Sequence, residues 1–365
     1  MKKYLKNLDI SSKEFCKKAV DECFKHKTSK QMKRKDIVAL FEKYKTRDAI
    51  AEAMSGALKK KELNLPQVKW DKRVDKSNNK VRDVGIEDIW MQLFDYVAWL
   101  ASMEMVPMLG HYQHSCIKGR GCELGKAVIA EWLAKGDIRE IRQFDIVHNY
   151  ATTSHERMLE FLERHTRNDA YTWLVGKLLS MNDKGGLIIG SVLSVILNAL
   201  YLSQAYHEIE GLYRVRHHKN GVNERIPLVG HVFFNVDDFA IYCTSAKNAE
   251  MATKRIVKIF HGLGYELHEV VKRHPTEKSY QDILGYRIYT DHVTMRHRNY
   301  VKIKKSISDF RKRPTLKHAR TLISRYGYVK HTNSVKFKKK YNSENMFIYA
   351  RRKESEYGKF RRGKA

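Results

Sequence analysis

Apolar residues recur at helical spacing over much of the chain. This pattern predicts a helical N-terminal region over residues 1–65, a strongly apolar helix at 88–106 and another helix at 191–209. Two capping-box patterns predict helix starts: Ser11 with Glu14, and Thr153 with Glu156. The last 70 residues also have helical spacing, but 351–365 holds seven Lys and Arg against two Glu, which predicts a tail that is disordered in the free protein.

Runs rich in Val, Ile, Phe and Tyr predict strands between these helices. The clearest runs lie at 138–146, 232–243 and 283–288, and a basic alternating stretch at 70–84 predicts a hairpin. The Asn-Gly pair at 220–221 predicts a tight turn between two short extended pieces. Strands mixed with helices, followed by a helical C-terminal region, predict an α+β fold without internal repeats.

The charge of the chain is its most unusual compositional feature. Seventy Lys and Arg residues against 41 Asp and Glu give a net charge of +29, which favours nucleic acid as the partner. A membrane surface is the competing interpretation, but no apolar run reaches the roughly 18 residues that a membrane span needs. The N-terminus lacks the apolar stretch of a signal peptide, and the five cysteines form no CxxC pair. We therefore expect a cytoplasmic nucleic-acid-binding protein with reduced cysteines.

Two adjacent aspartates, Asp237 and Asp238, stand between two apolar runs that predict the strands of a hairpin. Burying such a pair is costly unless a positive charge joins it. On its own the pair is equally consistent with a solvated turn. Asp145, at the end of another predicted strand and just before Ile146, supplies a third carboxylate. Three carboxylates at neighbouring strand ends favour a site for two Mg²⁺ ions about 3.5–4 Å apart, as phosphoryl transfer requires.

Several other residues are candidates to bind a nucleotide. Tyr150 follows Asp145 by five residues and would press against the sugar, which excludes a 2′-hydroxyl and favours dNTPs; plain packing is the alternative. Gly190 and Ser191 open a helix, and a helix N-terminus attracts phosphate or sugar oxygens; a capped core helix is the alternative. Four basic residues are candidates to bind triphosphate or the template backbone: Lys80, Arg82, Lys118 and Arg120.

Taken in order, these motifs resemble those of bacterial reverse transcriptases of the group II intron, retron and diversity-generating retroelement kind. The resemblance runs from about Leu63 to about Tyr341. The matching segments are Lys80-x-Arg82-x-x-Gly85-Ile86, Tyr112 to Arg120, Asp145 to His155, Gly190-Ser191-x-x-Ser194-x-x-x-Asn198, Val236-Asp237-Asp238, Leu263 to Leu267 with Lys272, Ile283-Leu284-Gly285-Tyr286, and Ser324 to Ser334.

The resemblance implies a right-hand polymerase that extends a DNA or RNA primer with dNTPs on an RNA template. The implied parts are a helical N-terminal extension (1–65), fingers (66–140), a palm with an antiparallel sheet (141–295) that contains finger insertions near 156–185 and a hairpin near 213–230, a helical thumb (296–342) and a basic tail (343–365).

The resemblance also assigns roles to individual residues. The catalytic set would be Asp145, Asp237 and Asp238, which with Ile146 would hold two Mg²⁺ ions, Mn²⁺ being the alternative. The nucleotide-binding set would be Lys80, Arg82, Tyr150, Gly190, Ser191, Asn198 and Lys272. The set that contacts nucleic acid would be Lys118, Arg120, Leu284, Gly285, Tyr286, Lys304, Lys305 and His331.

Two departures leave the branch of the family open. Asn235 stands where relatives commonly have Tyr or Phe, and Val195 stands where most have Pro or, in diversity-generating enzymes, Gln. A stand-alone enzyme that works with its own noncoding RNA and an accessory protein, in a retroelement or in antiphage defence, fits at least as well as an intron-mobility protein. Two alternatives stay open: a polymerase of the same fold that works without a template or primes from a protein side chain, and a non-catalytic RNA-binding scaffold.

Overall fold

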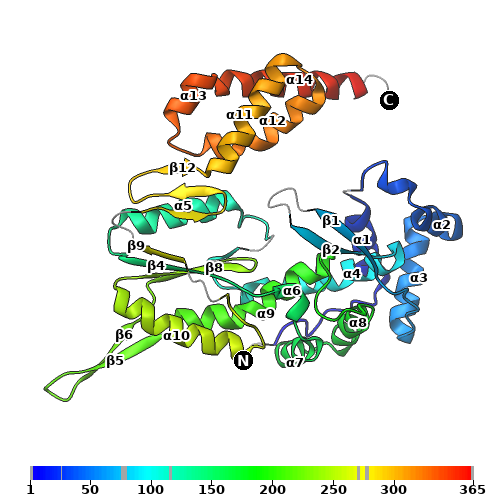
Figure 1. Cartoon of the computed structure of the whole chain (residues 1–365). Helices are drawn as coiled ribbons and strands as arrows, with labels where there is room; N and C mark the ends of the chain where they lie inside the picture. The colour runs from blue at the N-terminus through cyan, green and yellow to red at the C-terminus, as the bar shows by residue number, and fades with distance from the viewer. Residues whose placement is uncertain are drawn as a thin grey trace.

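The computed structural model describes residues 3–25, 27–74, 80–114, 117–268, 272–275 and 279–362. The chain is a mixed α+β structure, which confirms the predicted class (Figure 1). The tip of the predicted basic hairpin (75–79) and the end of the predicted tail (363–365) lie outside the described residues. No helix of the described part is long and apolar enough to cross a membrane.

A five-stranded sheet forms the centre of the molecule, with strand order β3–β7–β8–β4–β9. The strands are β3 (Gln113–His114), β7 (His231–Asn235), β8 (Asp238–Cys243), β4 (Glu140–Asp145) and β9 (Lys272–Pro275). β7, β8 and β4 pair antiparallel, and most of their residues are buried. Continuous apolar runs are typical of strands that are covered on both faces, which is why these segments do not alternate.

Two apolar cores lie on the two faces of this sheet. Phe239 stacks on Phe260 with ring centroids 4.9 Å apart, on the face covered by helices α9 and α10. Phe233 belongs to the other core, on the face covered by α5 (Figure 1). These helices are α5 (Cys122–Ala134), α9 (Val192–Glu210) and α10 (Ala246–Gly262). The hairpin β7–β8 is therefore held between two packed layers.

The helices of the first half of the chain other than α5 contribute to the core that also contains α9. They are α1 (Lys13–Lys25), α2 (Lys35–Tyr44), α3 (Arg47–Lys60), α4 (Ile89–Ser102), α6 (Asn149–Thr152), α7 (His155–His165) and α8 (Asp169–Leu179), with the 3-10 turns η1 (Gln31–Lys33) and η2 (Met103–Met108). Among them α1, α2 and α8 pack directly on the apolar helix α4.

Both predicted capping positions are wrong by one residue. The Phe15 amide donates to Ser12 Oγ, whereas Ser11 bonds to Asp9. Helix α7 is capped by Ser154, whose side chain accepts from the Arg157 amide. At each site two hydroxyl residues follow one another, and the sequence does not tell which of them adopts the extended conformation of a cap.

Two hairpins and a small sheet lie outside the central sheet. They are β1 (Lys69–Val74) with β2 (Val81–Ile86), β5 (Tyr213–His217) with β6 (Asn223–Pro227), and the three strands β10 (Gln281–Ile283), β11 (Tyr286–Ile288) and β12 (Val293–Met295). The Asn-Gly turn at 220–221 joins β5 to β6, as predicted, with Gly221 at a positive φ of 80°.

The C-terminal helices form a separate packed layer with its own core (Figure 1). They are α11 (His297–Lys312), α12 (Leu316–Lys330), α13 (Val335–Tyr341) and α14 (Ser343–Arg362). The prediction of disorder for 351–365 is wrong for residues 351–362, because α14 continues to Arg362. The preceding part of this helix, which was predicted to be helical, packs on α12: Phe347 stacks on Tyr326 with ring centroids 4.3 Å apart, and Ala350 is fully buried.

Candidate functional site

The three predicted carboxylates lie at the same end of the neighbouring strands β4 and β8 and in the turn beside them. Asp145 is the register partner of Asp238 across β4 and β8. Asp237 lies in the turn between β7 and β8, after Val236, which has a positive φ of 61°. A β-branched residue rarely adopts this conformation, and such strain is typical of functional turns. The predicted acidic hairpin is thus confirmed as a hairpin, with both aspartates at its turn end.

Burial is the main influence on Asp237, the acid in the turn at this end of the strands. Burial raises the pKa of Asp237, and the nearby negative charge of Asp145 raises it further, while Arg82 opposes both effects. Asp145 is about half exposed, and its Oδ2 lies 3.7 Å from Nε2 of His268. A cation at this end of the strands would relieve the repulsion between the carboxylates.

The acids open into a cavity of about 640 Å³. Asp145, Asp237 and Tyr150 of α6 line it, whereas Asp238 is not among its lining residues. Lys80, directly before β2, and Arg82 of β2 also line it. The cavity therefore combines carboxylates, an aromatic ring and two cations, drawn from segments that are far apart in the chain.

The loop between α8 and α9 builds another wall of the cavity. The Leu187 amide donates to the Tyr150 carbonyl at 2.7 Å, and His155 Nε2 lies 2.6 Å from the Gly186 carbonyl oxygen. Gly186 has a positive φ of 68°, and a Cβ added there would overlap the Tyr150 carbonyl oxygen. This glycine is thus required for the loop to reach α6, the helix that carries Tyr150.

The hairpin β1–β2 is fastened to this loop at the mouth of the cavity. The Trp70 indole N–H donates to Asp183 Oδ1 at 3.0 Å. Lys184 Nζ lies 2.7 Å from Asp83 Oδ2 and 4.5 Å from the centre of the Trp70 ring. We call these four side chains the latch. The sequence patterns did not point to it, because each of its residues is unremarkable in isolation.

Two of the predicted nucleotide-binding residues serve the fold in this structure. The side chain of Ser191 caps α9 by accepting from the Ser194 amide, and its hydroxyl donates to the buried carboxylate of Asp95. Gly190 has a φ of 116°, and a Cβ there would lie 3.0 Å from the Gly85 carbonyl oxygen of β2. The close backbone approach predicted for a ligand is made here to a strand.

Asn198 is fully buried inside α9, and neither its amide oxygen nor its amide nitrogen has a hydrogen-bond partner among the described residues. It therefore has no surface from which to contact a nucleotide in this structure. Asn149, which sequence reasoning missed, lines the cavity, is 4% exposed and has the same unpartnered amide. Its position directly before Tyr150 was the signal that could have found it. The side chain of Lys272 lies outside the described residues.

The residues predicted to contact nucleic acid fall into two groups. Lys118, Lys304 and Lys305 are exposed. The others have structural partners. Arg120 donates to the Gly110 and Gln113 carbonyls, His331 lies 3.0 Å from Glu123 Oε1, and Tyr286 is 2% exposed in the core against α5. Leu284 and Gly285 form the turn between β10 and β11, both at positive φ.

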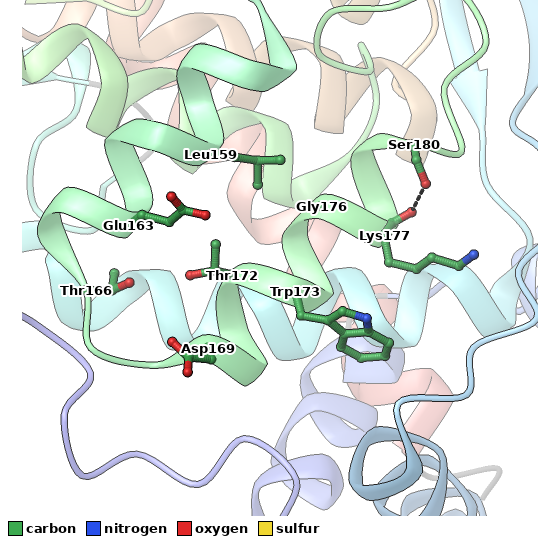
Figure 2. A pocket seen from close by; sticks show the side chains of 9 residues that line it. All are labelled: Leu159, Glu163, Thr166, Asp169, Thr172, Trp173, Gly176, Lys177 and Ser180. Carbon is green, nitrogen blue, oxygen red and sulfur yellow. Dashed lines mark hydrogen bonds between the residues drawn. The ribbon is translucent and has the colours of Figure 1, made fainter.

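A second cavity, of about 680 Å³, lies between α7 and α8 (Figure 2). Trp173, Lys177 and Glu163 are among the side chains that line it. It contains none of the residues that the sequence singled out. Its lining mixes one aromatic ring, one lysine and two acids, without a converging set of polar groups.

No protein-family model matches this chain, and no curated protein is significantly similar to it. Among the described residues, no three His, Cys, Asp or Glu side chains are grouped closely enough to form a ready-made metal site. The residues themselves fit a hard divalent cation in chemical type, because carboxylate oxygens are the donors that Mg²⁺ prefers.

Proposed function

We propose that this chain is an RNA-directed DNA polymerase that extends a primer 3′-hydroxyl with dNTPs. The observation that carries the proposal is the register of the sheet, which pairs Asp145 with Asp238 and leaves Asp237 in the adjoining turn. Asp145 and Asp237 line a cavity that Lys80 and Arg82 also line. Acids and cations around one cavity are the charges that a metal-bound triphosphate needs.

The proposal extends to a right-hand architecture. The central sheet with α9 and α10 would be the palm, and the hairpin β1–β2 with the helices around it would be the fingers. The layer α11–α14 would be the thumb, which then includes most of the segment expected as a tail. The support is the order of the elements along the chain together with the position of the acids at one end of β4 and β8.

The proposal assigns tasks to the three acids and to three residues that line the cavity. Asp145, Asp237 and Asp238, with the Ile146 backbone carbonyl, would hold Mg²⁺ or Mn²⁺. When bound, the cations lower the pKa of the attacking hydroxyl and neutralise the leaving pyrophosphate. Lys80 and Arg82 would orient the triphosphate through charge-assisted hydrogen bonds. Tyr150 would bound the sugar pocket, and the net charge of +29 would hold an RNA template, a DNA or RNA primer and a structured noncoding RNA.

Primer extension with purified protein tests the proposal. We expect Mg²⁺-dependent extension of a primer on an RNA template, and a loss of about 10³-fold or more in Asp238→Asn and in Asp145→Asn. Asp291→Asn is the matched control, because Asp291 is strongly exposed on the small sheet. All three variants should bind RNA as the parent protein does.

The products of the same assay separate the rivals. Products complementary to the template support templated synthesis, whereas products of unrelated sequence, or products attached to the protein, would show an untemplated or protein-primed enzyme. RNA binding without any metal-dependent synthesis would show a scaffold. Full synthesis by Asp238→Asn would refute the assignment of the site.

A further inference from the structure

The hairpin β5–β6 is an arm that the proposed polymerase site does not use. Its strands pair only with each other within the described residues, and Figure 1 shows it projecting from the body of the molecule. Its base is fixed by the Arg255 guanidinium, which donates to the Tyr213 carbonyl at 2.7 Å, and by Arg214, which donates to Asn248 at 3.3 Å. A two-stranded hairpin without further packing is marginally stable in water, so the fold itself gains little from the arm.

The arm lies at the far end of the sheet from the acids. Its last residue, Pro227, precedes the start of β7 by a short connection, whereas Asp237 lies just beyond the other end of the same strand. The five residues of β7 span about 17 Å, and the arm extends outward from the start of the strand. A ligand on the arm is therefore outside the cavity.

The arm and the helix that anchors it share one sign of charge. Residues 213–227 hold four Lys and Arg against one Glu, and α10 holds four against one. Seven of these eight basic residues are exposed, Arg214 being the one that is partly buried. The single acid of the arm, Glu224, is shared by Arg216 at 3.8 Å and His218 at 2.9 Å. Most of the positive charge is thus left for a partner.

We propose that the β5–β6 arm, together with the exposed face of α10, anchors the phosphate backbone of a structured nucleic acid outside the polymerase cavity. Charge complementarity selects a polyanion rather than a second protein surface. The exposed Tyr213, held under the Arg225 guanidinium at 4.7 Å, adds a stacking surface for a base or sugar. Because the arm is distant from the acids, a nucleic acid that contacts both must be longer than a short primer–template duplex.

The test is a neutralised variant, Arg216→Gln/Lys219→Gln/Lys258→Gln, whose three side chains are exposed. The matched control, Lys18→Gln/Lys33→Gln/Lys60→Gln, removes the same charge from exposed positions on the N-terminal helices. Anisotropy titrations at several salt concentrations use an RNA stem-loop, a DNA duplex of the same sequence and a single-stranded RNA. We expect the arm variant to bind the stem-loop about tenfold more weakly, with a salt slope smaller by about 2–3, since each phosphate contact contributes roughly 0.9.

Each outcome of the titrations either supports or overturns the proposal. A loss confined to the RNA stem-loop supports an RNA anchor, and an equal loss on the DNA duplex supports an anchor for either backbone. Equal binding by the arm variant, the control and the parent protein would overturn the proposal. So would unchanged RNA binding accompanied by a smaller particle in light scattering, because the arm would then join copies of the chain.

An extension assay on a short primer–template distinguishes a failure of the arm proposal from a failure of the polymerase proposal. The arm variant should extend such a substrate at the parental rate, because the duplex does not reach the arm. If the parent protein extends no primer, the polymerase proposal fails while the binding titrations still decide on the arm. Parental melting temperatures for both variants, and recovered binding in Arg216→Lys/Lys219→Arg/Lys258→Arg, exclude a folding defect.

Discussion

The hairpins β5–β6 and β7–β8 follow each other directly in the chain and have opposite surroundings. In β7–β8 most side chains are buried against helices on both faces, and the turn carries two acids. In β5–β6 nearly every side chain is exposed, and the turn region carries basic residues. Both have the same antiparallel pairing. The two hairpins therefore share their backbone pairing and differ in their packing. The packed hairpin β7–β8 holds the acids in place, and the unpacked hairpin β5–β6 is an arm on the surface.

The charges of the two hairpins follow their surroundings. At the end of the buried hairpin, burial and, to a smaller extent, the negative charge of Asp145 raise the pKa of Asp237. Basic residues on an exposed arm keep their hydration until a polyanion displaces counterions. We therefore expect substitutions in β7–β8 to change stability and substitutions in β5–β6 to change binding.

The largest expected effect is the loss of stability when a large buried side chain of β8 is removed. Phe239 is fully buried and stacks on Phe234, Phe144 and Phe260. Phe239→Ala should lower the free energy of unfolding by about 3–5 kcal/mol, the usual cost of removing a buried phenylalanine. Val215→Ala, at a 43% exposed position of β5, should change it by less than about 0.5 kcal/mol. Denaturant unfolding measures both changes in the free energy of unfolding. Equal losses would contradict the difference in packing between the two hairpins.

A second prediction concerns the cavity beside the acidic hairpin. Tyr150→Ala should open the sugar pocket and lower the discrimination of dNTP against NTP by about 10- to 100-fold, seen as a ratio of kcat/KM values. Tyr213→Ala, on the arm, should leave this ratio unchanged. Retained discrimination in Tyr150→Ala would show that the ring is only packed against α6 and its loop.

Sequence patterns predicted the positions of helices and strands better than the contacts between them. The apolar flanks of Asp237 and Asp238 and the Asn-Gly pair at 220–221 predicted both hairpins, because strand pattern and turn chemistry are local. The helical state of residues 351–362 was missed, because their charge count predicted disorder, whereas they continue the helix α14, which packs on α12 through Phe347. Whether a segment of mixed charge folds depends on a neighbour that the local pattern does not contain.

The candidate site was predicted only in part, again because a local pattern does not show which residues come into contact. Asp145, Asp237 and Tyr150 do line one cavity. Burial decides the other cases: Asn198 and Tyr286 lie inside the fold, and Arg120 is bound to carbonyl groups. Residue type and spacing do not distinguish a polar group that caps or braces the fold from one that faces a ligand. The latch at Trp70 and Lys184 was missed because it joins segments more than 100 residues apart.

A third prediction uses pH to test whether the acidic turn weakens the fold. The pKa of Asp237 is raised above its ordinary value of 3.8, so the folded protein holds this proton more tightly than the unfolded chain. The free energy of unfolding should therefore fall as the pH rises through the raised pKa. Asp237→Asn removes this loss and should gain on the order of 1 kcal/mol at pH 7, with the gain vanishing below about pH 4.

Two controls sharpen this result. Lys219→Gln, in the loop of the basic arm, should change stability by less than about 0.5 kcal/mol at either pH. Mg²⁺ should raise the melting temperature of the parent protein more than that of Asp237→Asn, because a ligand stabilises only the state that binds it. An Asn variant that is less stable than its parent at pH 7 would contradict the electrostatic argument.

The smallest expected effect belongs to β1–β2, which lies between the two extremes: its strands are largely exposed, but the latch fastens it over the cavity. Lys184→Met removes an ion pair and a cation–π contact that are both partly exposed, which together contribute about 1 kcal/mol or less. Since β2 carries Arg82, a looser hairpin should raise the KM for dNTP about two- to fivefold and leave kcat unchanged. Hydrogen exchange of the Gly85 amide, which donates to the Ile189 carbonyl, should quicken in parallel. Lys177→Met, in α8 near the same loop, is the control, and unchanged KM and exchange in Lys184→Met would show that packing alone holds β1–β2.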